Sequence, residues 1–348
     1  MSIQEVAKLA GVSAATVSRA FNFPDRVQPL TQARVTAAAK ALGYVPNASA
    51  RSLRTQRSRV IGVVLPTLLN PVFAECLEGI AMAAAKAGYA ILPVTTHYSL
   101  EDENKAIDQL LGVNVEGLIL VVSNPGKSVA LSRLSDLRRP YVLAYNRHPA
   151  QPCVSVDGEQ AVAAMVARLA GWGHQRILMM AGQLQTSDRA QQRCQGYLAA
   201  MRSQGLGEGQ VLEVPFIDSA IDQITPVLLS AAKPTAVICS NDLLALRCVR
   251  AAHKAGLRVP DDLSVVGFDG IAVGRDLTPS LCTISQPNAE IGQRCTELLV
   301  AALRDDRPLT PASSLTLPHR FVDGESCGLA PPNLSQPLNP KELLCQSV

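Results

Sequence analysis

From Val60 onward the chain alternates short apolar runs with amphipathic stretches, and this alternation limits its fold more than any other feature. Ten apolar runs have the length of buried strands; the first is VIGVVLP at 60–66 and the last is CTISQ at 282–286. Several of the intervening stretches, such as AECLEGIAMAAAKAG, place apolar residues at helical spacing. Such alternation forms right-handed βαβ units and parallel sheets. Ten strands are more than one open sheet usually carries, so we predict two α/β lobes.

Residues 2–45 instead predict three short helices. The first, IQEVAKLA, has apolar residues at helical spacing and stops at Gly11. Ser13 can cap the second, AATVSRAFN, and Thr31 can cap the third, QARVTAAAKALG. The chain is therefore expected to begin with a small all-α head, separate from the lobes.

The second helix of this head carries small side chains and one arginine. Two helices joined by a tight glycine-containing turn suggest a helix-turn-helix, whose second helix enters the major groove of DNA. Alanine methyl groups can contact thymine and arginine can pair with guanine, whereas hydroxyl and amide groups bond phosphates. An ordinary three-helix domain with a solvated basic face remains an alternative. The residues expected to contact DNA from this helix and its cap are Ser13, Ala14, Ala15, Thr16, Ser18, Arg19 and Asn22.

Charge is distributed unevenly along the chain. Residues 1–60 hold nine Lys or Arg and two acidic residues, which gives this segment a charge of +7, and the remainder carries −4. A basic head on a mildly acidic body is expected when only the head meets a polyanion.

Other features indicate a cytoplasmic protein. No apolar run reaches the length of a membrane span, and no export signal is visible at the N-terminus. The nine cysteines are scattered, odd in number and without a C-x-x-C pair, so they are expected to be reduced thiols.

The segments IQEVAKLAGVSAATVSRAFN and ALGYVPNASARSLRTQRSRVIGVVLP closely resemble the head and hinge of the LacI/GalR family of bacterial repressors. The resemblance continues in NPVFAECLEGI, GHQRILMMAG, PTAVICSNDLLAL and AGLRVPDDLSVVGFDG, and it covers about residues 2–330 in the family's order. It implies a ligand-controlled transcriptional regulator, most naturally a repressor, that acts as a homodimer on a pseudo-palindromic operator.

The resemblance also implies a hinge between head and lobes. The polar segment 47–55 would become helical only on DNA, consistent with its being too short to form a stable helix alone. Leu53 would act as a wedge between base pairs in the minor groove, although it could instead pack on the lobes. The hinge residues expected to meet DNA are Asn47, Ala50, Leu53 and Arg54.

The body resembles a periplasmic-binding-protein fold, in which three crossing strands join two Rossmann-like lobes around a small-molecule effector. The predicted domains are a helix-turn-helix head at 1–45, a hinge at 46–59, an effector-binding and dimerisation domain at 60–330 and a flexible tail at 331–348. Within the large domain, one lobe takes about 60–157 and 288–316, and the other about 158–287 and 317–330.

Ligands of open α/β sheets bind beyond the carboxyl ends of the strands, and several polar residues fall there. Some of them could simply be loop or cap residues, and the segment at Asn146 and Arg147 looks shifted by one position from the family pattern. Arg193 is expected to open a helix. The predicted effector-binding residues are Asn70, Phe73, Asn146, Arg147, Arg193, Asn241, Asp269 and Gln286.

The ligand suggested by these residues is a sugar or a sugar acid. Asn288 stands where relatives often have an aromatic residue, and LPTLLNPVFAECLEGI looks most like gluconate-type repressors. Enzyme motifs are missing: NPGKS has Val121 where a phosphate-binding loop needs glycine, and no H-E-x-x-H or G-x-S-x-G occurs. No cofactor or metal is therefore expected. A solute-binding protein of a transport system is the alternative, but it would have no use for a basic head.

Overall fold

The structure, a computed structural model, describes residues 1–45, 57–216 and 220–332. The chain forms two compact units that divide between Ser58 and Arg59. The hinge residues Asn47, Ala50, Leu53 and Arg54 lie outside the described residues, as does the tail at 331–348 apart from its first two residues.

Residues 1–45 of the first unit form three α-helices and a short 3-10 turn, η1 (Pro24–Arg26). Ser13 caps the second helix, as predicted: the Thr16 N–H donates to its Oγ at 3.1 Å. The prediction that Thr31 caps the third helix is wrong. That helix starts at Pro29, because proline at the first helical position already has helical φ and needs no N–H partner. The helices are α1 (Ile3–Ala10), α2 (Ala14–Asn22) and α3 (Pro29–Leu42).

The core of this head consists of small aliphatic side chains from all three helices. Val6, Val17 and Val35 are completely buried at its centre. Gly11 takes a left-handed backbone conformation (φ 62°) between α1 and α2, which glycine adopts at little cost. The Arg34 guanidinium from α3 donates to the carbonyls of Ala10 and Gly11, so the turn between the first two helices is held by the third.

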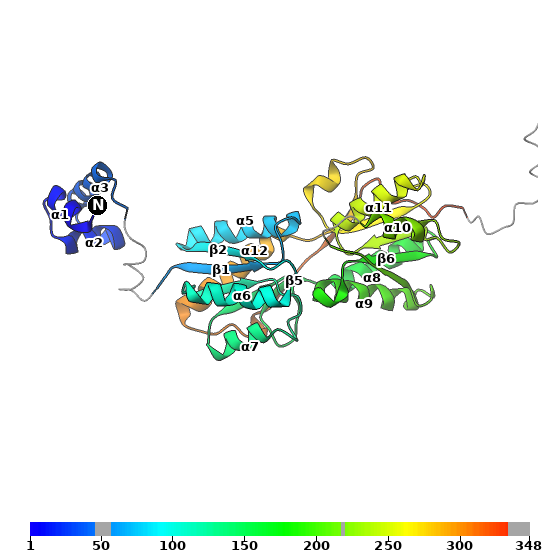
Figure 1. Ribbon diagram of the computed structural model, residues 1–348, viewed down its shortest axis with the longest axis horizontal. Helices are drawn as coiled ribbons and strands as arrows, with labels where there is room; N and C mark the ends of the chain where they lie inside the picture. Colours follow the sequence, from blue (N-terminus) through cyan, green and yellow to red (C-terminus); the bar gives the residue numbers. More distant parts are fainter. Residues whose placement is uncertain (46–56, 217–219, 333–348) are drawn as a thin grey trace, which may run out of the picture. The chain divides into compact units, whose positions relative to one another are not determined.

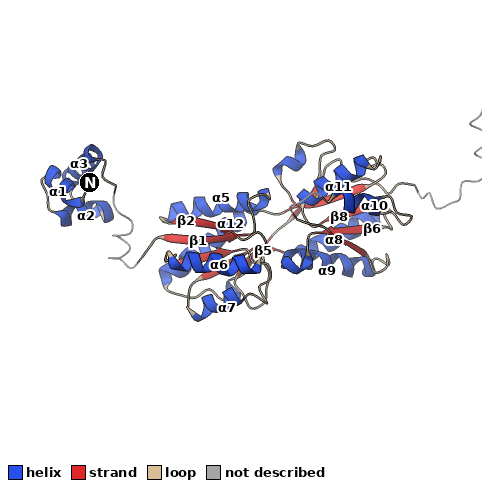
Figure 2. Cartoon of the chain, viewed as in Figure 1, coloured by secondary structure: helices blue, strands red, loops and turns tan. Residues whose placement is uncertain are grey.

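The second unit consists of two α/β lobes, each a six-stranded sheet between two layers of helices (Figures 1 and 2). The sheet of the first lobe has the order β11-β5-β4-β3-β1-β2 and is parallel throughout. Its strands are β1 (Val60–Leu65), β2 (Ala90–Thr95), β3 (Gly117–Leu120), β4 (Tyr141–Ala144), β5 (Cys153–Val156) and β11 (Leu315–Leu317). Its helices are α5 (Pro71–Ala87) and α12 (Asn288–Asp305) on one face, and α6 (Leu100–Gly112) and α7 (Val129–Asp136) on the other.

The sheet of the second lobe has the order β12-β10-β9-β8-β6-β7, and only β12 runs antiparallel to its neighbour. Its strands are β6 (Ile177–Ala181), β7 (Gln210–Glu213), β8 (Ala236–Cys239), β9 (Ser264–Asp269), β10 (Cys282–Ser285) and β12 (Arg320–Val322). Its helices are α8 (Gly158–Gly171) and α9 (Asp188–Ser203) on one face, and α10 (Ile221–Leu228) and α11 (Asp242–Lys254) on the other. The 3-10 turns η2 (Leu184–Thr186), η3 (Ala272–Arg275) and η4 (Pro311–Ser313) lie in loops.

The predicted fold class is confirmed: a helical head accompanies an α/β body of two lobes. The chain passes from one lobe to the other three times, after β5, after β10 and after β11. All ten predicted strands are present. Helices α7 and α10 and strands β11 and β12 were not predicted.

Helices α5 and α12 approach each other closely because each has a glycine at the contact. A Cβ on Gly79 would lie 2.0 Å from the carbonyl oxygen of Ala289, and a Cβ on Gly292 would lie 2.1 Å from that of Cys76.

We expect Gly79→Ala to lower the free energy of unfolding by about 1–3 kcal/mol, because the two backbones must separate to admit a methyl group. Urea denaturation checks this. Gly112→Ala, where a Cβ meets nothing within 4 Å, is the control; equal stability of the two variants would contradict the prediction.

Candidate functional site

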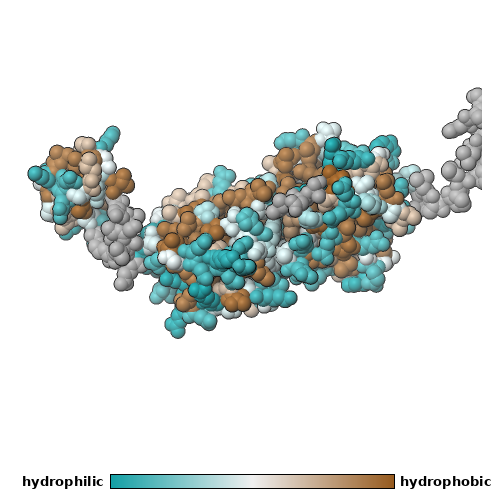
Figure 3. Space-filling view, viewed as in Figure 1, coloured by the Kyte–Doolittle hydropathy of each residue, from teal (hydrophilic) through white to brown (hydrophobic). Residues whose placement is uncertain are grey.

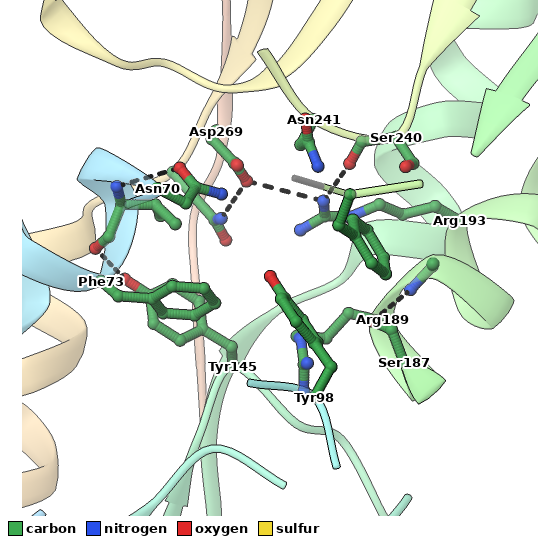
Figure 4. Close-up of a pocket in the computed structure, with 14 residues that line it drawn as sticks. Asn70, Phe73, Tyr98, Tyr145, Ser187, Arg189, Arg193, Ser240, Asn241 and Asp269 are labelled. Carbon is green, nitrogen blue, oxygen red and sulfur yellow. Dashed lines mark hydrogen bonds and ion pairs between the residues drawn. The ribbon is translucent and has the colours of Figure 1, made fainter. Parts of the chain in front are cut away.

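A cavity lies between the two lobes of the second unit, and residues at the carboxyl ends of parallel strands line it (Figure 4). The segments after β1, β2 and β4 contribute from the first lobe, and those after β6, β7, β8, β9 and β10 from the second. This is where α/β sheets bind ligands. The lining residues are Asn70, Val72, Phe73, Tyr98, Tyr145, Ser187, Arg189, Ala190, Arg193, Phe216, Ser240, Asn241, Asp269 and Gln286.

A buried ion pair forms the polar centre of this cavity. The Arg193 Nη1 lies 3.5 Å from the Asp269 Oδ1 and also donates to the Ser240 carbonyl. Gln286 donates from Nε2 to the same Asp269 oxygen at 2.8 Å. Burial raises the pKa of Asp269 to about 6, against the opposing effect of Arg193, and burial also lowers the pKa of Arg193. Each charge depends on the other inside a site with little water.

The prediction that Arg193 opens a helix is wrong. Helix α9 begins at Asp188, which places Arg193 in its second turn. From there the guanidinium carbon lies 3.5 Å from the centroid of the Phe268 ring. Stacking on this ring and the ion pair with Asp269 hold the guanidinium at the cavity wall.

Four aromatic rings also line the cavity. Phe73 and Tyr145 pack edge to face with centroids 5.8 Å apart, and Tyr145 donates its hydroxyl to the Val72 carbonyl at 3.0 Å. Tyr98 of the first lobe stacks on Phe216 of the second, with centroids 4.7 Å apart and ring planes 10° apart. The site therefore combines apolar faces with a buried ion pair and amides, a combination that suits a ligand bearing several hydroxyl groups on an apolar skeleton.

A second buried carboxylate holds the turn that carries Asp269. Asp242 accepts through Oδ2 from the N–H groups of Gly270 (2.7 Å) and Ile271 (2.8 Å), and through Oδ1 from the Thr283 hydroxyl (2.6 Å). Asp269 has φ 119°, a conformation that a residue with a side chain rarely adopts. Asp242 thus stabilises an unfavourable backbone conformation that aims Asp269 at the cavity.

This carboxylate makes stability depend on pH. Burial, and then the charge of Asp269, raises the pKa of Asp242 to about 7 from an ordinary value of 3.8. The protonated form therefore favours the folded protein, and this contribution is lost as pH rises from about 4 through about 7. In Asp242→Asn, the new amide could accept from both N–H groups and donate to Thr283 without titrating. We expect the melting temperature of Asp242→Asn minus that of wild type to increase from pH 4.5 to pH 8, as measured by differential scanning fluorimetry. A difference that does not change with pH would contradict this.

Six of the predicted effector residues line the cavity and two do not. Asn146 is completely buried beside it, where its Nδ2 donates to the Val122 carbonyl (2.8 Å) and to Asp188 (2.7 Å). Arg147 points away and pairs with Asp157, which also caps α8. The residue before them, Tyr145, is the one that reaches the cavity. The buried amide of Asn146 thus joins the two lobes where a ligand contact was expected.

In the head, the side chains predicted to meet DNA divide into two groups. Ser13, Ala15 and Arg19 are exposed. Ala14 packs partly against the head core, and Asn22 donates to the Ser18 carbonyl at 2.6 Å. The outward face of α2 therefore presents small side chains and one arginine, with Val17 and Ala20 facing inward.

The described part of the chain contains no helix long and apolar enough to cross a membrane. Within the same residues, no three His, Cys, Asp or Glu side chains gather in a way that could hold a metal ion.

A helix-turn-helix head and a two-lobed α/β body with a polar cavity between the lobes define a ligand-responsive DNA-binding regulator. Residues 2–47 match the bacterial regulatory proteins of the lacI family. Residues 58–323 match the periplasmic binding proteins and sugar binding domain of the LacI family. The chain belongs to the LacI family.

Individual relatives match nearly the whole chain. Catabolite control protein A of Priestia megaterium is 31% identical over 92% of this chain and 97% of its own length. The repressor CytR of Escherichia coli is 34% identical over 86% of this chain and 89% of its own length. A crystal structure of the Lac repressor dimer bound to operator and the anti-inducer ONPF superposes with a TM-score of 0.83, at 27% identity over 94% of this chain and 98% of that one.

The chain is thus a DNA-binding transcriptional repressor with an effector-binding domain, and its relatives are regulators, not enzymes. Repressors of this family bind operator DNA as dimers and bind small-molecule effectors. A transport protein is not favoured, because the head matches a DNA-binding family.

Proposed function

We propose that the cavity at Arg193 and Asp269 binds a sugar or a sugar acid, and that its occupancy changes the affinity of the head for an operator of a carbohydrate or sugar-acid catabolic operon. The observation that carries this is the convergence of the ion pair with Asn241, Gln286 and aromatic rings on one cavity. Asn70, Phe73, Arg193, Asn241, Asp269 and Gln286 are the proposed effector-binding residues. Asn146 supports the site from outside.

On DNA, α2 would lie in the major groove of a pseudo-palindromic operator. Ala15 and Arg19 are exposed and would contact base edges. The hydroxyl groups of Thr16 and Ser18 would bond phosphates. A homodimer would place two heads on the two half-sites. Exposed apolar residues support self-association: Leu69, Met82 and Leu92 lie on or beside α5 and β2, where Figure 3 shows apolar side chains at the surface.

A thermal-shift screen of the intact protein tests the effector class. The panel contains d-glucose, d-galactose, d-gluconate, d-galactonate, cellobiose, cytidine and adenine. We expect a sugar or a sugar acid to raise the melting temperature and to change binding to an operator selected from random duplex DNA. Stabilisation by cytidine or adenine alone would overturn the effector class. If none of the compounds alters operator binding, that result would count against control through this cavity.

A further inference from the structure

The cavity is too small for the ligand it is proposed to bind. The volume in which the centre of a water molecule can lie is only about 30 Å³. This is room for roughly two water molecules. A sugar needs several times this space. The lobes must therefore separate or a lining side chain must move before an effector can enter.

Tyr98 is the side chain that fills the cleft. It comes from the loop between β2 and α6 of the first lobe and lays its ring against Phe216 of the second lobe. Figure 4 shows its hydroxyl aimed into the space between Arg193 and Phe73. In the described part of the chain this hydroxyl has no hydrogen-bond partner. Phe216 is held from behind, because a Cβ on Gly182 would lie 2.0 Å from its ring, and Arg247 donates to its carbonyl at 2.8 Å.

The loop that carries Tyr98 is held in an unfavourable conformation. His97 and Tyr98 both have left-handed backbone angles (φ 51° and 61°), which residues with bulky side chains rarely adopt. The Ser99 N–H closes this turn by donating to the Thr96 carbonyl at 2.8 Å, and the stack on Phe216 adds a contact across the lobes. Moving the Tyr98 ring outward would lose the stack on Phe216 but would leave this backbone hydrogen bond in place.

We propose that Tyr98 is a built-in plug that occupies the effector position and must be displaced when the effector binds. Its ring takes the apolar platform on Phe216, and its hydroxyl faces the polar groups that a ligand would use. The inference rests on the proposed effector role of the cavity. A plug that fills the site most of the time lowers the apparent affinity by the fraction of time that the site is open.

A chemical-complementation experiment tests whether the ring fills a ligand-sized hole. Tyr98→Ala should leave a cavity that p-cresol, the tyrosine side chain as a free molecule, can fill, since small apolar cavities bind aromatic molecules. We expect p-cresol to raise the melting temperature of Tyr98→Ala and to bind it at least about 10-fold more tightly than wild type in calorimetry. Tyr98→Phe keeps the ring, and His97→Ala alters the same loop at an exposed position; both should behave as wild type.

Two results would overturn the plug. The first is equal binding of p-cresol by wild type and Tyr98→Ala, or binding by neither. The second comes from repeating the compound panel on Tyr98→Ala: every compound that stabilises wild type should bind the variant at least about 10-fold more tightly, and equal or weaker binding would show that the effector does not compete with Tyr98. A panel in which no compound stabilises wild type counts against the proposed function, and the p-cresol result then decides the plug alone.

Discussion

Arg193→Ala will weaken the binding of the effector by about 100-fold or more while leaving effector-free operator binding within about 3-fold of wild type. The guanidinium lies at the cavity wall, and its loss also leaves Asp269 buried without its cation. Losing hydrogen bonds to a charged group costs about 1.5–3 kcal/mol each, and about 1.4 kcal/mol is tenfold in affinity. Isothermal titration with whichever panel compound stabilises wild type measures the change.

Arg147→Ala is the matched control for this prediction. Arg147 is also an arginine of the effector domain, but it is half exposed, lies outside the cavity and pairs with Asp157. It should keep effector affinity within about 3-fold. Asp269→Asn should behave like Arg193→Ala. Near-normal effector binding by both Arg193→Ala and Asp269→Asn would remove the cavity as the effector site.

Val17→Asp will abolish operator binding, with a loss of at least about 1,000-fold, while the effector domain keeps its melting temperature. Val17 is completely buried in a core made of small side chains, and a carboxylate has no partner there. Burying an unpaired charge costs several kcal/mol, which a head of this size cannot supply. Without the folded head, nothing presents α2 to the major groove. Fluorescence anisotropy with operator DNA measures the loss.

Leu30→Asp makes the same chemical change at a head position that is 83% exposed. It should keep the head folded and weaken operator binding by no more than about 10-fold, through its added negative charge. Circular dichroism melts separate loss of folding from loss of contact. Retained operator binding by Val17→Asp would show that DNA binding does not depend on the folded head.

Regular periodicity explains why most of the fold could be predicted. Ten of the twelve strands are short, mainly apolar runs, and the long helices between them repeat their apolar residues every three or four positions. The missed elements lack these signals. Helix α10 contains Pro226, and β11 and β12 have three residues each, so their places depend on pairing with strands distant in the sequence.

The site was predicted less completely, for a geometric reason. Cavity residues at or shortly after the ends of strands β1, β8, β9 and β10 were found because they follow the rule for carboxyl ends of strands. The same rule applied to β2 and β7 would have suggested Tyr98 and Phe216. Arg189 lies one helical turn before Arg193 and could have been found from that spacing. The inter-lobe role of Asn146 could not have been found, because it depends on how two lobes fold against each other.

Control of the head through the cavity is tested most directly by the operator affinity of the intact protein, measured by anisotropy with and without a saturating amount of the compound that binds the cavity. We predict a change of about 5–150-fold, the usual range for coupling between two sites, and no change in Arg193→Ala at the same concentration. A filled cavity with an unchanged operator affinity would contradict it.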